Sequence, residues 1–481
     1  MRVCTSKVCG GAVLVLLAVC PSAVRGQQTQ DQQQAPVPAY STPLGSVFGG
    51  NQPAGDAAPQ TLSPDKTPLT GAQELSLGTP AESRTYWQPH FYVTATGDSN
   101  PLAGNQKSWV TYTSILGGLD LHKTSTRSDL AVMYSGGGTI SNDGNIGNSV
   151  IQQLGLSEKI SGRRTTLSLF DQLGYIPEAG FGYGGGGVGL PVGGLAGLQT
   201  GFLPGQTILT QRGQRLTNSS VVELDRNLTA RNALTFTGGY SLMHYFDVSL
   251  LNFNDTIIQT GFSRQLSREN TAGFLYLFNA YRFSGYGETI YDHSVQLSYG
   301  RKLTGRLAFR AQAGPEVAVF HQPATASLGT GPSAPPTTDH LYGSGSVALT
   351  YQLERTGLGF GYNHGVSGGS GVFAGALTDQ VSGYVNRTLS RASSAGFNFG
   401  YSRNRGLGTL NAANQNQVYG YWFGGVNWNH PFSRTTKLAL SYQMEYQSGS
   451  SSFCVGLECG RSLVRHEASM TFGWRSRPLV F

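Results

Sequence analysis

The stretch VNWNHPFSRTTKLALSYQMEYQ, residues 426–447, decides how this chain folds. From Lys437 onward apolar and polar side chains alternate, with one set formed by Leu438, Leu440, Tyr442, Met444 and Tyr446. Successive side chains of a β-strand point to opposite faces, so this period of two predicts a strand with one apolar and one polar face. A second alternating run, residues 418–429, enters the same short polar segment, HPFSRTT. The stretch therefore predicts a β-hairpin.

The same kind of polar segment recurs along the chain. Each copy is short, contains Arg or Lys with Ser or Thr, and lies between two alternating runs; the copies are at residues 122–129, 158–165, 225–232, 263–270, 300–306, 353–357, 386–393 and 429–436. Eight such turns join sixteen strands, and residues 91–97 and 463–474 add two more. We therefore expect eighteen strands, with sixteen as the alternative, and both chain ends on the side of the short turns.

Composition indicates which all-β class this is. Of the 481 residues only 12% are charged, whereas a soluble chain carries about a quarter. Beyond the N-terminus no apolar run approaches the ~20 residues that a membrane helix needs. Low charge without long apolar runs is typical of a transmembrane antiparallel up-and-down β-barrel, in which lipid-facing and lumen-facing residues alternate. The alternative is a large soluble β-sandwich or propeller array.

Several strands can be assigned to faces. In residues 294–299, 341–353 and 395–401 the odd-numbered side chains are predicted to face lipid and the even-numbered ones the lumen. The even-numbered set is polar or small, which indicates a hydrated lumen and not a dry core. An aromatic cluster, Tyr419, Tyr421, Trp422 and Phe423, is predicted to belong to a girdle at the membrane interface.

The N-terminal region divides into two segments. Residues 1–26 are typical of a secretory signal peptide, with Arg2 and Lys7 before an apolar stretch; lipid attachment at Cys20 is the less favoured alternative. Residues 27–85, rich in Gln and Pro, are predicted to be a disordered periplasmic segment. Residues 86–481 then form the barrel. Cys454 and Cys459 remain after signal removal and are predicted to form a disulfide with each other.

Together these features resemble the Gram-negative outer-membrane porin-type β-barrels, over roughly residues 86–481. In that family the last strand ends in an aromatic residue that the assembly machinery reads. Phe481 matches, but Arg475, Arg477 and Pro478 interrupt the usual alternation. The resemblance also implies that the third outward loop folds inward and narrows the pore. The segment 174–219 matches by order and length, and its candidate constriction residues are Glu178, Phe181, Tyr183 and Phe202. It lacks the family's acidic cluster, and a surface position is the alternative.

No enzyme motif is present in the sequence. There is no GxSxG, no phosphate-binding loop with Lys and Ser or Thr, and no HExxH or paired His spacing. His244 lies near Ser241 in the sequence, so a Ser–His pair of a lipid hydrolase is the weaker reading, and a plain amphipathic His is preferred. We expect no enzymatic activity, no cofactor and no metal site.

The charged residues that are predicted to line the lumen are the main indication of function in the sequence. The predicted lumen-lining charges are Arg306, Arg310, Glu445, Arg465 and Glu467. They either select ions or form salt bridges that stiffen the wall. The net charge of +7 is concentrated near the short turns, where cations meet lipid phosphates. A ring of this kind does not indicate nucleic-acid binding.

The sequence therefore predicts an outer-membrane channel for passive diffusion of small hydrophilic solutes, in contact with outer-membrane lipid. Two alternatives stay open: a non-conducting surface or assembly barrel that binds a polymer or protein partner, and an export barrel for polysaccharide. Whether the chain is a monomer or a homo-oligomer is also left open.

Overall fold

The structure, a computed structural model, describes part of the barrel region in detail. The described residues are 85–101, 109–142, 147–177, 208, 213–247, 250–284, 288–321, 337–390, 392–407, 418–449 and 462–480. The proposed signal peptide, almost all of the segment 27–85, the Cys454–Cys459 pair and Phe481 lie outside them.

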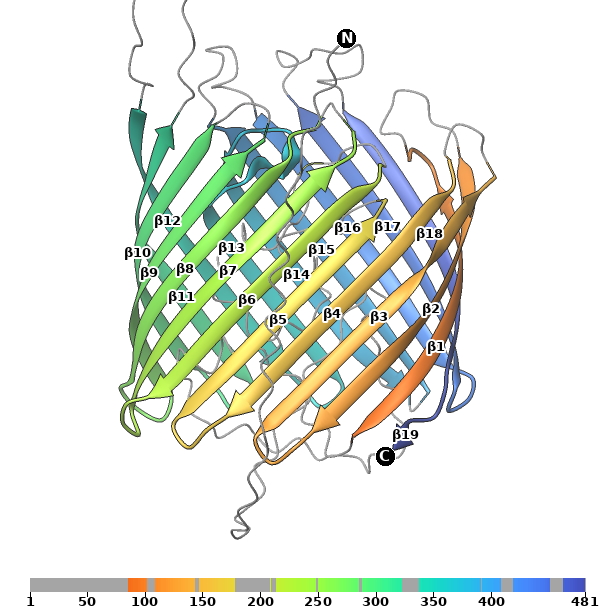
Figure 1. The fold of residues 1–481 in the computed structure, drawn as a ribbon, viewed down its shortest axis with the longest axis horizontal. Coiled ribbons are helices and arrows are strands. Elements are labelled where there is room, and N and C mark those ends of the chain that lie inside the picture. The colour runs from red at the N-terminus through yellow and green to blue at the C-terminus, as the bar shows by residue number, and fades with distance from the viewer. Residues whose placement is uncertain are drawn as a thin grey trace, which may run out of the picture. The chain divides into compact units, whose positions relative to one another are not determined.

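Eighteen long strands and one short strand form a single antiparallel sheet that closes on itself (Figure 1). The first nine are β1 (Tyr86–Asp98), β2 (Val110–Thr124), β3 (Ser128–Ser141), β4 (Ser149–Ser161), β5 (Thr165–Ile176), β6 (Arg215–Asn227), β7 (Asn232–Tyr245), β8 (Phe253–Gln265) and β9 (Asn270–Phe283). The next nine are β10 (Thr289–Lys302), β11 (Leu307–His321), β12 (Thr337–Gln352), β13 (Thr356–Ser367), β14 (Ala376–Ser390), β15 (Ser393–Gly406), β16 (Val418–Pro431), β17 (Thr436–Gly449) and β18 (Leu463–Arg475). One short 3-10 helix, η2 (Gly369–Gly371), follows β13. No helix among the described residues is long and apolar enough to cross a membrane.

Each strand pairs with its neighbours in the chain, and β1 closes the barrel against β18. All eight predicted polar segments form the short turns, so the expected strand number is confirmed. The last strand ends at Arg475, where the sequence suggested an interruption. The chain then resumes as β19 (Leu479–Val480), which pairs with the start of β1. Both ends of the barrel therefore lie on the side of the short turns.

The two faces of the wall have opposite character to those of a soluble β-protein. Leu297, Leu341 and Phe397 are exposed on the outside, as predicted from their odd numbers, whereas Ser294 and Gln296 are buried inside. The inward polar side chains bond across strands, as in the Ser294–Ser344 contact and in the pairs Thr94–Thr471, Ser114–Thr139 and Ser441–Ser469. An apolar outside with a polar inside is the arrangement that a membrane barrel needs.

The aromatic cluster on β16 is only partly where the sequence placed it. Trp422 is exposed on the outer face, as expected of a girdle residue. Tyr419, Tyr421 and Phe423 are buried on the opposite face, where Phe423 pairs with Glu445 of β17. The girdle prediction is therefore wrong for these three rings, because they share the parity of the lumen side chains.

A charge on the outer wall tests the membrane-spanning character of the barrel. We expect Leu297→Arg, on β10, to lower the free energy of unfolding by about 2–4 kcal/mol, because it places a cation in hydrocarbon. The matched control is Leu303→Arg in the exposed β10–β11 turn, with an expected change within about 0.5 kcal/mol. Urea unfolding in lipid vesicles measures both. Equal effects of the two changes would contradict the assignment of the outer face.

Candidate functional site

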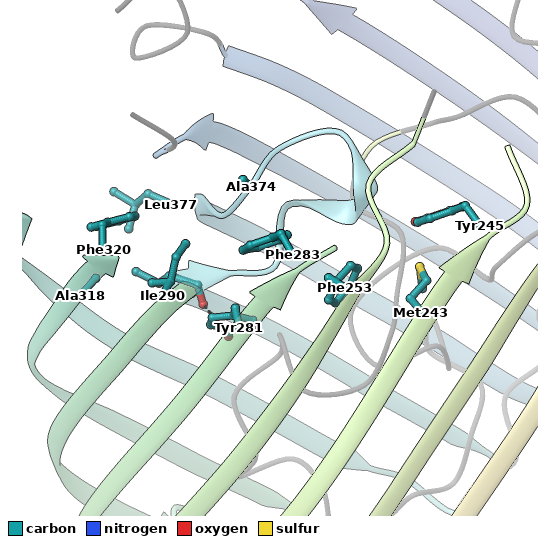
Figure 2. Packing of buried hydrophobic residues seen from close by; sticks show 11 residues of the cluster. Met243, Tyr245, Phe253, Tyr281, Phe283, Ile290, Ala318, Phe320, Ala374 and Leu377 are labelled. Carbon is teal, nitrogen blue, oxygen red and sulfur yellow. Dashed lines mark hydrogen bonds between the residues drawn. The ribbon is translucent and has the colours of Figure 1, made fainter. Parts of the chain in front are cut away.

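The loop end of the β13–β14 hairpin lies inside the barrel. β13 pairs with β12 only as far as Gly345–His364, but with β14 as far as Ser367–Ala376. We call residues 365–378 the hairpin end. Figure 2 shows Phe253, Tyr281, Phe283 and Ile290 of β8 to β10 around Ala374 and Leu377 of this segment. The hairpin end therefore packs on the inner wall and occupies part of the lumen.

A buried apolar cluster holds the hairpin end in this position. It comprises Val366, Ala374 and Leu377 of the hairpin end, and Met243, Tyr245, Phe253, Tyr281, Phe283, Ile290, Ala318 and Phe320 of β7 to β11. Burial of each large apolar side chain contributes about 1.5–3 kcal/mol. The cluster therefore holds the hairpin end against the wall. It also keeps the apolar side chains of the hairpin end out of contact with water in the lumen.

Glycines allow the hairpin end to turn inside the barrel. Gly369, Gly371 and Gly375 have φ values of 73°, 76° and 83°, in the left-handed region that side chains disfavour. Space is limiting as well, because a Cβ on Gly371 would lie 2.5 Å from Cε2 of Tyr245, and one on Gly375 2.3 Å from Cδ1 of Ile290. Gly369 and Gly371 of the GGSG run, residues 368–371, and Gly375 beyond it therefore allow the close approach to the wall.

Two polar contacts anchor the backbone of Val366. Its N–H donates to Oε1 of Glu316 on β11 at 3.3 Å, and its carbonyl accepts a hydrogen bond from the Tyr281 hydroxyl on β9 at 3.4 Å. A second buried carboxylate, Asp292 of β10, accepts from Nδ2 of Asn279 at 3.1 Å. These groups are all buried, so polar side chains of β9 to β11 hold the backbone of the hairpin end against the wall.

A second apolar contact involves the long loop between β5 and β6. Ile208 of that loop is buried with Phe373 and Ala376 of the hairpin segment and with Tyr419 of β16. The loop is the third outward connection in the chain, as counted from the sequence. The candidate constriction residues Glu178, Phe181, Tyr183 and Phe202 lie outside the described residues. Their role stays a prediction, whereas the described inward element is the seventh outward connection.

Three of the predicted lumen charges come together near the closing seam of the barrel. Arg465 of β18 lies 3.6 Å from Oε2 of Glu445 and 3.5 Å from Oε2 of Glu467. Its Nε also donates to both carboxylate oxygens of Asp98, the last residue of β1, at 3.0 Å. The Arg465 guanidinium is 1% exposed and the Asp98 carboxylate fully buried. One cation surrounded by three carboxylates thus joins β1, β17 and β18 on the lumen side.

The other two predicted lumen charges stand apart from this cluster. Arg306 is exposed in the turn before β11, and Arg310 lies on β11, far along the sheet from β18. At the opposite end of the seam, Arg475 bonds to Asp120 of β2 at 2.5 Å, and His90 of β1 lies 3.5 Å from the same carboxylate. Asp98 and Asp120 were not predicted, because only the register of β1 against its neighbours brings them to these arginines.

Ser241 and His244, the candidate Ser–His pair, both lie on β7. Ser241 is fully buried on the lumen parity of β7, whereas His244 has the outer parity and packs its ring edge-on against Phe246. The two side chains therefore lie on opposite faces of the wall and cannot form a hydrolase pair. No set of three or more His, Cys, Asp or Glu side chains in the described part of the chain is arranged to hold a metal ion.

Comparison with known proteins gives similarity to solved structures alone. No family model and no curated protein matches the sequence. Pseudomonas aeruginosa OccK2 (OpdF) is 10% identical, with 82% of this chain and 98% of that chain covered and a TM-score of 0.42. Acinetobacter baumannii OccAB4 is 11% identical, with 82% and 99% covered and a TM-score of 0.40. A further structure of OccK2, 9% identical over 81% of this chain and 97% of that chain, has a TM-score of 0.41 and is a complex with glucuronate. At this level the similarity says nothing about the solutes of this chain.

Proposed function

We propose that the chain is an outer-membrane channel through which small hydrophilic solutes diffuse, and that the hairpin end narrows its lumen. The observation that carries the proposal is the polar inner wall. Rows of Ser, Thr, Gln and Asn side chains face inward on both sides of the barrel, at Thr94 and Thr471 on the seam and at Ser294 and Gln296 on β10. Such a surface stays hydrated and offers hydrogen bonds to a passing solute.

The proposed channel also has an expected location and route of assembly. Residues 1–26 would direct export, and the apolar outer face would contact outer-membrane lipid. Phe481 would be read by the outer-membrane assembly machinery, as the porin resemblance implies. The lumen charges, among them Arg465 and its three carboxylates, would favour the passage of solutes with one sign of charge over the other.

The apolar cluster around the hairpin end favours a second candidate. A surface or assembly barrel that binds a polymer or protein partner needs no open path, and Phe253, Tyr281 and Phe320 with the hairpin end fill part of the lumen with apolar side chains. The two proposals differ in whether ions cross the protein.

Single-channel recording of the refolded full chain in a planar bilayer separates them. We expect steady conductance steps, because a polar lumen with a side segment leaves a hydrated path. A control preparation of heat-unfolded protein should give none. If neither the folded chain nor a variant without residues 368–375 conducts, the result would contradict the channel and support the partner-binding barrel.

A further inference from the structure

We infer that the hairpin end has a second position, in which it pairs with residues 337–344 of β12. Movement from the inward position to this second position opens the lumen. This inference rests on the proposed channel function for its effect on conductance, but not for the movement itself. It follows from three observations: an unpaired strand edge, a matching register, and side chains suited to both positions.

The first observation is the free edge of β12. Its full length from Thr337 to Gln352 pairs with β11, but pairing with β13 covers only Gly345 to Gln352. Residues 337–344 therefore present their other edge to no strand of the described chain. An unpaired edge is a template for another strand, and proteins normally cover it or blunt it. Leu341, in this segment, is 73% exposed.

The second observation is the register. Continuing the pairing of Gly345 with His364 by two residues would place Val366 opposite Gly343. The N–H and carbonyl of Val366 that would then bond to β12 are the two groups that bond to Glu316 and Tyr281 in the inward position. Moving the hairpin end therefore exchanges two hydrogen bonds to side chains for two to a strand, and leaves no backbone group of Val366 without a partner.

The third observation is the parity of the apolar side chains. Phe360 and Tyr362 are exposed on the outer face of β13, and Val366 has the same parity. Leu377 pairs directly with Val366, so it shares that face. In the inward position both side chains pack in the lumen cluster, whereas in the position paired with β12 they would lie on the outer face beside Leu341. Leu341 would be their apolar neighbour there, as the lumen cluster is in the inward position.

The available space also permits the paired position. A Cβ on Gly343 would point to the outer face and would have no atom within 4 Å, so Gly343 leaves room on that face for the Val366 side chain. By contrast, a Cβ on Gly365 would lie 3.8 Å from the Cβ of Ser344 in the inward position. The strands thus separate immediately after this point, which acts as the hinge of the movement.

Two double-cysteine variants test the inference in the full chain. The Cβ atoms of a disulfide are about 3.8 Å apart, so Gly343→Cys with Val366→Cys can crosslink only in the paired position. Ser344→Cys with Gly365→Cys is the matched control, since those positions are close enough already. Mass spectrometry of proteolytic peptides after mild oxidation identifies which thiols are joined, and so separates the new pairs from Cys454 and Cys459.

We expect both variants to crosslink, and the oxidised Gly343–Val366 variant to conduct at least about twofold more than its reduced form, because the hairpin end has left the lumen. The control should show no such change. No Gly343–Val366 crosslink beside a complete control crosslink would overturn the inference, as would a crosslink that leaves conductance unchanged in a conducting channel. If the unmodified chain is silent, the channel proposal fails, and the crosslink yield alone still decides whether the hairpin end moves.

Discussion

Replacing Arg465 with methionine is expected to lower the free energy of unfolding by about 3–5 kcal/mol. The physical reason is the burial of its partners. Without the guanidinium, the carboxylates of Asp98, Glu445 and Glu467 lie close together on the lumen side and have lost the cation that they share. Removing one partner of a buried ion pair costs far more than the pair contributes, because the remaining charge keeps its desolvation penalty.

The expected loss of stability comes from the seam that closes the barrel, because the cluster lies there. Asp98 is on β1 and Arg465 on β18, the strands that close the sheet, and they are 367 residues apart in the chain. Urea unfolding in lipid vesicles, followed by loss of the compact band in unheated gel samples, measures the change. Arg301→Met, at an exposed position of β10, is the matched control and should alter stability by less than about 1 kcal/mol.

A rescue variant shows whether charge is the cause. Adding Asp98→Asn and Glu445→Gln to Arg465→Met removes most of the unbalanced charge, so we expect much of the lost stability to return. Wild-type stability in the single variant would show that the cluster does not hold the seam. If the single variant loses stability and the two added substitutions restore none of it, the loss comes from the packing of the long arginine side chain.

The sequence predicted the wall of the barrel because the wall is determined locally. Alternation at residues 437–447 needs only the pleat of one strand, and a turn such as residues 430–436 needs only its own Ser, Thr and Arg residues. The Ser433 hydroxyl indeed accepts the N–H groups of Thr435 and Thr436 in that turn, at 3.1 and 3.0 Å. Eight similar turns therefore gave the number of strands and the side on which the barrel ends lie.

The site depends on contacts between distant segments. Glu445 and Arg465 could be placed on the lumen side by parity, but Asp98 joins them only through the register of β1 on β18. The hairpin end was missed for a similar reason. Val366 and Leu377 have the parity of lipid-facing residues, and the surface that draws them inward is formed by β7 to β11. The signal that was available is the GGSG run at residues 368–371.

Shortening the hairpin is expected to raise single-channel conductance at least about twofold. Residues 368–375 would be replaced by Asn-Gly, which forms the two-residue turn that suits paired strands and would join the Ser367–Ala376 pair directly. The change removes η2, Phe373 and Ala374 from the lumen. It leaves Val366 and Leu377 in place, so the end of the shortened hairpin still has apolar side chains to bury.

The comparison with a second deletion locates the constriction. Removal of residues 178–206 tests the third outward loop, which the porin resemblance implies to be the narrow point. If the hairpin end is the main obstruction, its truncation gives the larger increase. A larger increase from the 178–206 deletion would assign the constriction to the third loop, and no increase from the hairpin truncation would contradict our reading of the inward segment. Ile208 packs against Phe373. The hairpin truncation removes Phe373, and the 178–206 deletion shortens the loop that carries Ile208, so the double deletion should increase conductance by less than the product of the two single effects.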